Sequence, residues 1–166
     1  IIVVGHASGL YLDYLNHKMW SDTVPDKLRG IIDKEKYKKS QLYYRANSKF
    51  SNISSSFFLV LILSMLFLGG FAWIDNIARS LTDNRILITL IFFGIIGLAS
   101  DILSMPFAWY DTYVIEEKFG FNRTTKKTFI LDHMKSWLLA LLIGAPLLAL
   151  ITWIYYETGD FFWILV

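Results

Sequence analysis

The sequence predicts an all-α protein, a polytopic transmembrane helix bundle with three full spans and two truncated ones. Of its 166 residues, 55% are hydrophobic and 17% aromatic, more than a globular domain contains. The apolar residues form runs of about 20 separated by blocks of charge. That length crosses a hydrocarbon core of ~30 Å at about 1.5 Å of rise per residue. We therefore predict an integral membrane protein.

Three apolar runs are long enough to span a bilayer: 53–74, 86–105 and 137–156. The run 53–74 contains no Lys, Arg, Asp or Glu and carries Gly69-Gly70 near its far end. Pro106 is expected to end or kink the helix of the second run. In the third run, Gly144-Ala145-Pro146 predicts a kink whose freed backbone groups neighbouring helices must satisfy.

The two ends of the chain are predicted to be partial spans. Residues 1–15 are apolar with polar interruptions, as expected for the tail of a first transmembrane helix, and 161–166 would begin a fifth. The chain opens inside an apolar run, without Met or the charged start of a signal peptide. We expect a piece of a larger protein; the alternative is an isolated small membrane protein.

The segment 16–52 is polar and strongly basic. Between Lys27 and Lys49 it holds eight Lys/Arg against two acidic residues, a local charge of +6. Pro25 has a fixed φ that suits the first turn of a helix, and a weak apolar stripe at helical spacing follows it. Two interpretations remain open: a helix lying at an anionic headgroup surface, or an ordinary charged linker helix.

Cation counting predicts the topology. The segments 16–52 and 106–136 hold nine and five Lys/Arg, whereas 75–85 holds two and 157–160 none. Because Lys and Arg concentrate in cytoplasmic loops, the two long segments are predicted to be cytosolic and the start of the chain to lie outside. The chain that follows a completed fifth helix would then be cytosolic. The apolar runs make the lipid bilayer a partner of this chain. A net charge of +2 is too small to suggest that it binds nucleic acid.

Three residues of the run 86–105 are predicted to support helix packing. Gly94 and Gly97 would allow another helix to approach closely. Asp101 is costly to bury alone, so it should face other protein or water. The alternative is that Asp101 lies at the interface and reaches the lipid headgroups.

The segment 116–127 differs from the apolar runs on both sides of it, because it combines carboxylates, a Phe-Gly-Phe tract, an Asn, hydroxyls and cations. One interpretation is a solvated loop held at the membrane surface by its two Phe side chains. The other is a loop that docks against another part of the protein or frames the approach of a substrate. The candidate residues for that role are Glu116, Glu117, Phe119, Gly120, Phe121, Asn122, Arg123, Thr125 and Asp132.

The sequence contains no recognisable catalytic pattern. A zinc hydrolase usually carries His-Glu-x-x-His, which places two ligands on one helical face, whereas His6, His17 and His133 are far apart. The adjacent Glu116 and Glu117 would point about 100° apart on a helix and could not act together on one substrate. There is no Cys for a thiolate nucleophile. We predict no catalytic residue and no metal ligand in this chain.

Several stretches nevertheless resemble the membrane region of the type I CAAX prenyl proteases, which are integral-membrane zinc metalloendopeptidases of the gluzincin type. The similar stretches are Tyr11–Asn16, Val24-Pro25, Glu35–Ser40 with Tyr44, Ile115–Thr125 and Lys127–Asp132. The most specific is Ile115-Glu-Glu-Lys-Phe-Gly-Phe-Asn-Arg-Thr125. The resemblance covers nearly the whole chain and corresponds to the five-helix N-terminal membrane domain of that family.

The resemblance implies a non-catalytic membrane half that forms part of an intramembrane chamber and supports a downstream cytosolic protease domain. That domain would bind the zinc and cut near the C-terminus of prenylated or other membrane-associated substrates. Two other hypotheses remain open. One is a stand-alone membrane scaffold that recruits partners through its basic segments, and the other is a transporter with its site at Asp101 and the 144–146 break.

Overall fold

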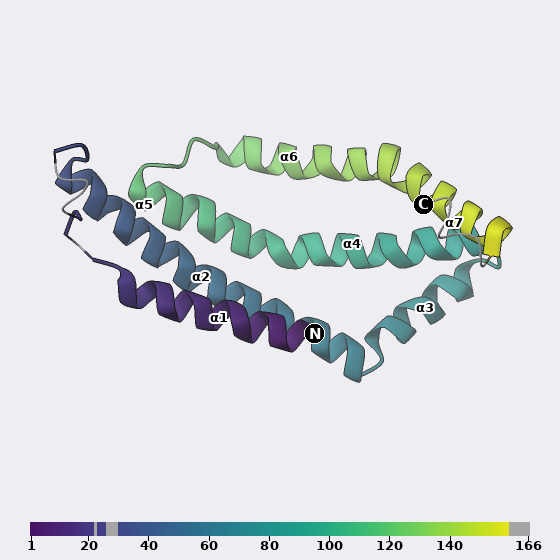
Figure 1. The fold of residues 1–166 in the computed structure, drawn as a ribbon. Coiled ribbons are helices and arrows are strands. Elements are labelled where there is room, and N and C mark those ends of the chain that lie inside the picture. Colours follow the sequence, from purple (N-terminus) through teal and green to yellow (C-terminus); the bar gives the residue numbers. More distant parts are fainter. Residues whose placement is uncertain (22, 26–29, 160–166) are drawn as a thin grey trace. The chain divides into compact units, whose positions relative to one another are not determined.

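The structure is a computed structural model that describes residues 1–21, 23–25 and 30–159. All regular elements of the described part are helices, which confirms the predicted all-α class (Figure 1). In chain order the elements are α1 (Ile2–Met19), α2 (Lys34–Phe67), α3 (Gly70–Leu81), α4 (Arg85–Tyr110), the π-helical segment η2 (Asp111–Glu116), α5 (Glu117–Phe119), α6 (Lys126–Leu139), the π-helical segment η3 (Ala140–Gly144) and α7 (Ala145–Thr158). The predicted fifth span, 161–166, lies outside the described residues.

The chain forms two compact units, which we describe separately. The first contains Ile1–Leu68 and Ser104–Arg123, so it comprises α1, α2, the end of α4, η2 and α5. The second contains Gly69–Leu103 and the described residues from Thr124 onward, so it comprises α3, most of α4, α6, η3 and α7.

Within the described residues, three continuous helical stretches are long and apolar enough to cross a membrane: Lys34–Phe67, Arg85–Phe119 and Lys126–Thr158. They contain the predicted runs 86–105 and 137–156 and most of 53–74. A polytopic membrane protein is therefore the class that the structure supports.

In the first unit, α2 joins the basic segment to the apolar run in one helix of 34 residues. Asp33 caps its start, because its carboxylate accepts hydrogen bonds from the backbone N–H groups of Glu35 (2.9 Å) and Lys36 (3.0 Å). Residues 34–52 precede the apolar run and extend for about 28 Å at 1.5 Å per residue. This basic part and the apolar part form one continuous helix, so it is not a separate helix, and we call residues 34–52 the projecting part of α2.

The predicted helix start at Pro25 is therefore misplaced. Pro25 itself lies outside any helix, and Gly30–Ile32 form a turn before the cap. Residues 26–29, on which the rest of that prediction falls, are outside the described residues.

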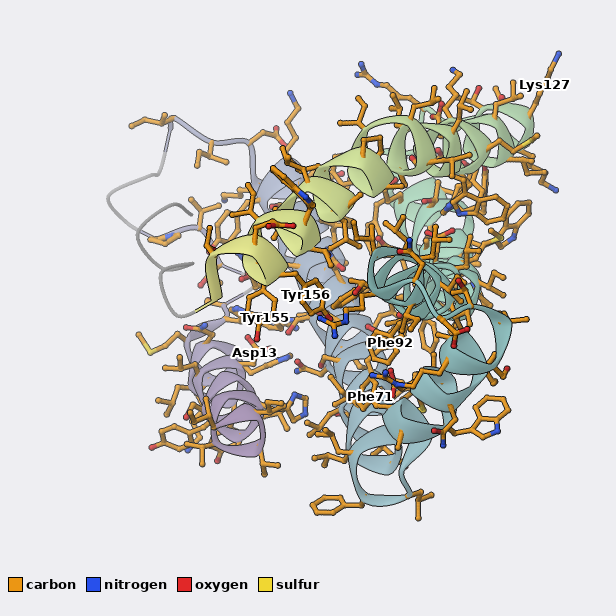
Figure 2. The ribbon with its side chains drawn as sticks, turned by 90° about the vertical axis from the view of Figure 1, so that its right-hand side faces the viewer. Asp13, Phe71, Phe92, Lys127, Tyr155 and Tyr156 are labelled. Carbon is orange, nitrogen blue, oxygen red and sulfur yellow. The ribbon has the colours of Figure 1, made fainter. Side chains whose placement is uncertain are left out.

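Helix α1 lies beside α2 (Figure 1). Two polar contacts join them: His6 Nε2 is 3.1 Å from Ser56 Oγ, and Ser48 Oγ donates to Asp13 Oδ2 over 3.5 Å. Asp13 is labelled on α1 in Figure 2. Helix α1 continues to Met19, four residues beyond the predicted end of the first partial span.

The predicted span 53–74 is not a single helix. Helix α2 ends at Phe67, and Gly69 has φ = +72°, a left-handed conformation that L side chains rarely adopt. A glycine in this conformation is a common helix stop, and a separate helix, α3, begins at Gly70. The Gly69-Gly70 pair thus separates the end of the apolar run from its helix.

Two π-helical segments lengthen the later spans without ending them. The sequence predicted that Pro106 ends or kinks the helix. Helix α4 passes through Pro106 and continues directly into η2 and α5, so Pro106 does not end it, and the kink stays a prediction. Helix α6 similarly passes into η3 and α7, with Pro146 in the first turn of α7. Proline lacks the backbone N–H that would donate to the carbonyl four residues earlier, so the regular hydrogen-bond pattern is interrupted at Pro106 and Pro146. The two π-helical segments lie close to these prolines in the sequence.

In the second unit, α3, α4 and α7 surround a pocket of about 350 Å³. Phe71, Phe92 and Tyr156, labelled in Figure 2, are among its lining residues. The guanidinium of Arg79 donates to Asp75 Oδ2 over 2.6 Å, and this hydrogen bond raises the pKa of Arg79. Arg85 lies over the Tyr156 ring, 5.1 Å from its centroid.

Candidate functional site

The loop after α5 is built on a glycine turn. Gly120 has φ = +72°, and its N–H donates to the carbonyl of Glu117 over 3.0 Å. The N–H of Phe121 donates to the carbonyl of Glu116 over 2.9 Å. These two bonds form a Schellman motif, which satisfies the last carbonyls of a helix and requires a left-handed residue at this position. The Phe-Gly-Phe tract therefore ends the helix at a fixed place.

Two side chains stabilise the rest of the loop. Asn122 Nδ2 donates to Glu117 Oε2 over 2.7 Å, which ties the loop back to α5. Thr125 caps α6, because its hydroxyl accepts a hydrogen bond from the N–H of Thr128 over 3.1 Å. Glu117, Asn122 and Thr125 thus have structural roles in the loop.

The loop packs on the projecting part of α2. Phe119 is buried, with 7% of its surface exposed, and its ring centroid is 5.5 Å from that of Tyr43. Phe121 is half exposed and its ring lies 4.7 Å from the same Tyr43 ring. Lys39 Nζ lies 5.7 Å from the Phe121 ring. Aromatic pairs at these distances attract each other, so within the first unit the loop docks on α2 of its own chain.

Of the two Phe side chains expected to hold a solvated loop at the membrane surface, Phe119 is buried against α2 and Phe121 is half exposed. Docking of the loop on another domain, or a role in substrate approach, stays a prediction. Of the other candidate residues, Glu116 is half-buried and Arg123 is exposed. Asp132 lies on α6, where its carboxylate is 3.5 Å from Lys135 Nζ on the exposed side of that helix.

Asp101 has partners on another helix of the second unit. Its Oδ2 atom accepts a hydrogen bond from Trp137 Nε1 over 2.8 Å and lies 3.3 Å from His133 Nδ1. Both partners belong to α6 and stand four residues apart, so they share one helical face. Asp101 therefore faces protein. Its partners are 32 and 36 residues away in the sequence, and only the His/Trp spacing on α6 could have suggested them.

The close packing predicted at Gly94 and Gly97 stays a prediction. Within the described residues, a Cβ added at either position meets no heavy atom within 4 Å.

The described residues do not fit a zinc site. They contain no group of three or more His, Cys, Asp or Glu side chains that could hold a metal ion. The nearest arrangement, Asp101 with His133, offers only two ligands, fewer than the three protein ligands of a catalytic zinc. His6 contacts Ser56, and His17 stacks on Trp20 with ring centroids 3.7 Å apart.

Long apolar helices, a basic projecting helix and a loop that docks on it define this chain as a multi-pass membrane domain. The comparison with known proteins gives its family. Residues 13–166 match the family described as CAAX prenyl protease N-terminal, five membrane helices, and the chain belongs to that family.

The CAAX prenyl protease 1 homolog of Oryza sativa subsp. japonica is 33% identical over 159 residues, covering 91% of this chain and 37% of the rice protein. CAAX prenyl protease 1 of Saccharomyces cerevisiae is 33% identical over 165 residues, covering 92% of this chain and 36% of the yeast protein. The crystal structure of S. mikatae Ste24p superimposes with a TM-score of 0.89 at 33% identity, over 98% of this chain and 40% of that one. The chain thus spans little more than a third of the length of these proteins.

Proposed function

We propose that this chain is the non-catalytic membrane half of a CAAX-prenyl-protease-like zinc metalloendopeptidase. In this role its helices form part of the wall of an intramembrane chamber. Its projecting elements support a cytosolic protease domain that follows in the parent protein. That domain holds the zinc and hydrolyses peptide bonds near the C-terminus of prenylated or other membrane-associated substrates.

The observation that carries the proposal is that the chain belongs to the CAAX prenyl protease N-terminal family while its described residues lack a set of metal ligands. Almost the whole chain is similar to proteins named CAAX prenyl protease 1 or its homolog, and the similar part is about a third of the length of each of those proteins. Its described residues offer no set of metal ligands. A division of labour, with membrane scaffolding here and hydrolysis in another part of the parent, accounts for both observations.

The distribution of charge supports a cytosolic position for the basic segments. Fourteen of the 16 Lys/Arg lie in 16–52 and 106–136. Positively charged loops remain in the cytosol during insertion, which places the start of the chain outside and directs a completed fifth helix inward. A protease domain that follows it would then meet the projecting part of α2 and the loop docked on it.

The docked loop is the surface that we propose for this support. Phe121 remains 49% exposed although it touches Tyr43, and Arg123 beside it is exposed. A loop with a half-exposed aromatic side chain and a neighbouring exposed cation suits contact with a second domain or with an approaching substrate. Burial of Phe119 holds that loop in place.

The proposal is tested with the intact parent protein purified in detergent. We expect about one zinc ion per molecule and cleavage of a synthetic prenylated peptide, whereas residues 1–166 alone retain no zinc and cleave nothing. Absence of a His-Glu-x-x-His sequence from the coding region after Val166 would contradict the proposal, as would zinc-independent cleavage.

The role of the loop is tested separately. In the intact protein, Phe121→Ala and Asn122→Ala should lower the cleavage rate without abolishing zinc binding. Leu142→Ala, which alters an exposed residue of η3, is the matched control. Wild-type turnover in both loop variants would remove the loop from the proposed function while leaving the membrane role intact.

A further inference from the structure

Helix α3 separates its apolar and polar side chains. At about 100° per residue, its large apolar residues fall on one side of the helix. They are Phe71, Trp73, Ile74, Ile77, Ala78 and Leu81. The polar residues fall on the other side and are Asp75, Asn76, Arg79 and Ser80. A short helix of this kind is suited to the boundary between an apolar and an aqueous phase.

Only one edge of the apolar side is covered by the described part of the second unit. Ile74 and Ala78 are buried, with 5% and 0% of their surface exposed. Trp73 and Leu81, on the adjoining edge, are 66% and 67% exposed. Large apolar side chains that are exposed together mark a contact with protein or with membrane. The open edge of α3, which carries Trp73 and Leu81, therefore needs a second apolar environment.

The second unit places α3 at the level where two spans end. Arg79 lines the pocket of about 350 Å³ together with Arg85 and Tyr156. Arg85 is the first residue of α4, and Tyr156 is the last residue of the apolar run in α7. Trp153 and Tyr155, close to that end of α7, are exposed. Exposed Trp and Tyr at the end of a span are typical of the membrane–water interface.

Short connections keep both ends of α3 near a membrane surface. Leu68 and Gly69 join it to α2, and residues 82–84 join it to Arg85. The apolar part of α2, 53–67, extends for about 22 Å, less than the ~30 Å of a hydrocarbon core, so the apolar first turn of α3 continues the crossing. The 12 residues of α3 extend for only about 18 Å, which is too short for a second crossing.

We propose that α3 lies in the membrane interface at the surface where α4 begins and α7 ends, opposite the basic segments. Trp73, Ile77 and Leu81 insert among the acyl chains next to the headgroups, whereas Asn76 and Ser80 face the headgroups and water. The indole suits this depth, because it combines an apolar ring with one N–H donor. Lipid, and not a later part of the parent, covers the open edge of α3. The proposal depends on the membrane spans and not on the protease role.

The charges of α3 do not attract it to a particular headgroup. Arg79 donates to Asp75 over 2.6 Å, so the two charges on the polar side balance each other. Insertion of the apolar side chains then supplies the attraction to the bilayer. Contact with lipid is therefore expected to be independent of the headgroup charge.

The experiment uses photo-crosslinking in the intact parent protein. Leu81→p-benzoyl-phenylalanine places a photoreactive group on the open edge of α3, at an exposed position with room for the larger side chain. The protein is reconstituted in vesicles of palmitoyl-oleoyl phosphatidylcholine and irradiated, and the peptide that contains α3 is analysed by mass spectrometry. We expect this peptide to carry the mass of one phospholipid. Trp73→p-benzoyl-phenylalanine, on the same edge, should give the same adduct.

Asn76→p-benzoyl-phenylalanine is the matched control. Asn76 is exposed and lies about 140° around the helix from Leu81. Its lipid adduct should be severalfold weaker than the adduct at Leu81. Equal adducts at the two positions would show that α3 has no fixed orientation in the interface and would overturn the proposal.

Three other outcomes would also overturn the proposal. A crosslink from Leu81 to a peptide of a later part of the parent would show that protein covers the open edge. Absence of any adduct at both Trp73 and Leu81 would show that this edge faces water. A severalfold stronger lipid adduct in vesicles that contain phosphatidylglycerol would show that headgroup charge holds α3, whereas equal adducts in the two kinds of vesicle support insertion of the apolar side chains.

Discussion

Two contacts in this domain stabilise long helices by different means. In the first unit, the loop after α5 is held to α2 by rings, with Tyr43 lying between Phe119 and Phe121. In the second, α4 is held to α6 by polar groups, with Asp101 accepting from Trp137 beside His133. The first contact lies on the projecting part of α2 and the second lies within the predicted membrane span.

The surroundings explain the difference. Where water is present, burial of apolar rings is favourable, so an aromatic cluster can fix a loop. Within a bilayer, lipid is as apolar as the rings, and a hydrogen bond between helices supplies the specificity that apolar contact lacks. A carboxylate there also needs partners to remain in place. The aromatic contact is thus favoured in water, and the hydrogen-bonded contact is favoured in lipid.

The largest effect is predicted for the aromatic contact. Phe119→Ala should lower the free energy of unfolding by about 3 kcal/mol, because the buried ring leaves a cavity against Tyr43. The measurement is unfolding in detergent with increasing sodium dodecyl sulfate. Phe67→Ala, at a position 83% exposed at the end of α2, is the control and should change little. Equal losses in the two variants would show that Phe119 is not anchored on α2.

The polar contact is predicted to follow. Trp137→Phe replaces the indole by a smaller aromatic ring and removes the N–H that donates to Asp101, so a partly buried carboxylate loses a partner at a cost of about 2 kcal/mol. Trp153→Phe makes the same change at an exposed position of α7. The free energies of unfolding of the two variants are compared in the same assay. An unchanged free energy of unfolding in Trp137→Phe would mean that the hydrogen bond between Asp101 and Trp137 does not stabilise the domain.

The turn beneath the aromatic contact should be less sensitive. Gly120→Ala places a Cβ on a residue with φ = +72°, which costs about 1 kcal/mol. The nearest atom to that Cβ is Lys39 Nζ at 3.6 Å, an ordinary contact, so the loss comes from the backbone and not from a clash. Lys39→Ala combined with Gly120→Ala should therefore not restore stability, and restoration would identify steric conflict as the cause.

The smallest effect is predicted at Gly97. An added side chain meets open space, so Gly97→Leu should change the stability of residues 1–166 by less than about 1 kcal/mol. A much larger loss in the intact protein than in residues 1–166 would show that a later part of the parent packs on this face of α4, as the small residues there suggested.

The apolar runs and the charge blocks between them were sufficient to predict an all-α membrane protein, because span length and charge are local properties. The limits of α2 were not predictable in the same way. Lys and Ser are compatible with both a helix and a linker, so nothing local distinguishes a basic helix on the surface from one that continues into the membrane. The helix stop at Gly69 did have a signal, the Gly-Gly pair, which the apolar run around it obscured.

The unusual composition of 116–127 drew attention to a segment that the structure shows as a glycine turn packed on α2, and its role as a functional site stays a prediction. The residue on which it packs, Tyr43, is more than 70 residues away in the sequence. It lies in the segment 16–52, whose interpretation depended mainly on its positive charge. The Asp101 contact is similar, since its partners, His133 and Trp137, lie more than 30 residues away on α6 and no local pattern pairs them with Asp101.

The claim that this chain supports a separate protease domain is tested most directly by splitting the parent protein after Val166. The two parts are expressed separately and together in membranes, and cleavage of a prenylated peptide is measured. The account predicts that the second part alone is inactive and that co-expression with residues 1–166 restores cleavage. A second part that cleaves at the rate of the intact protein without residues 1–166 would contradict it.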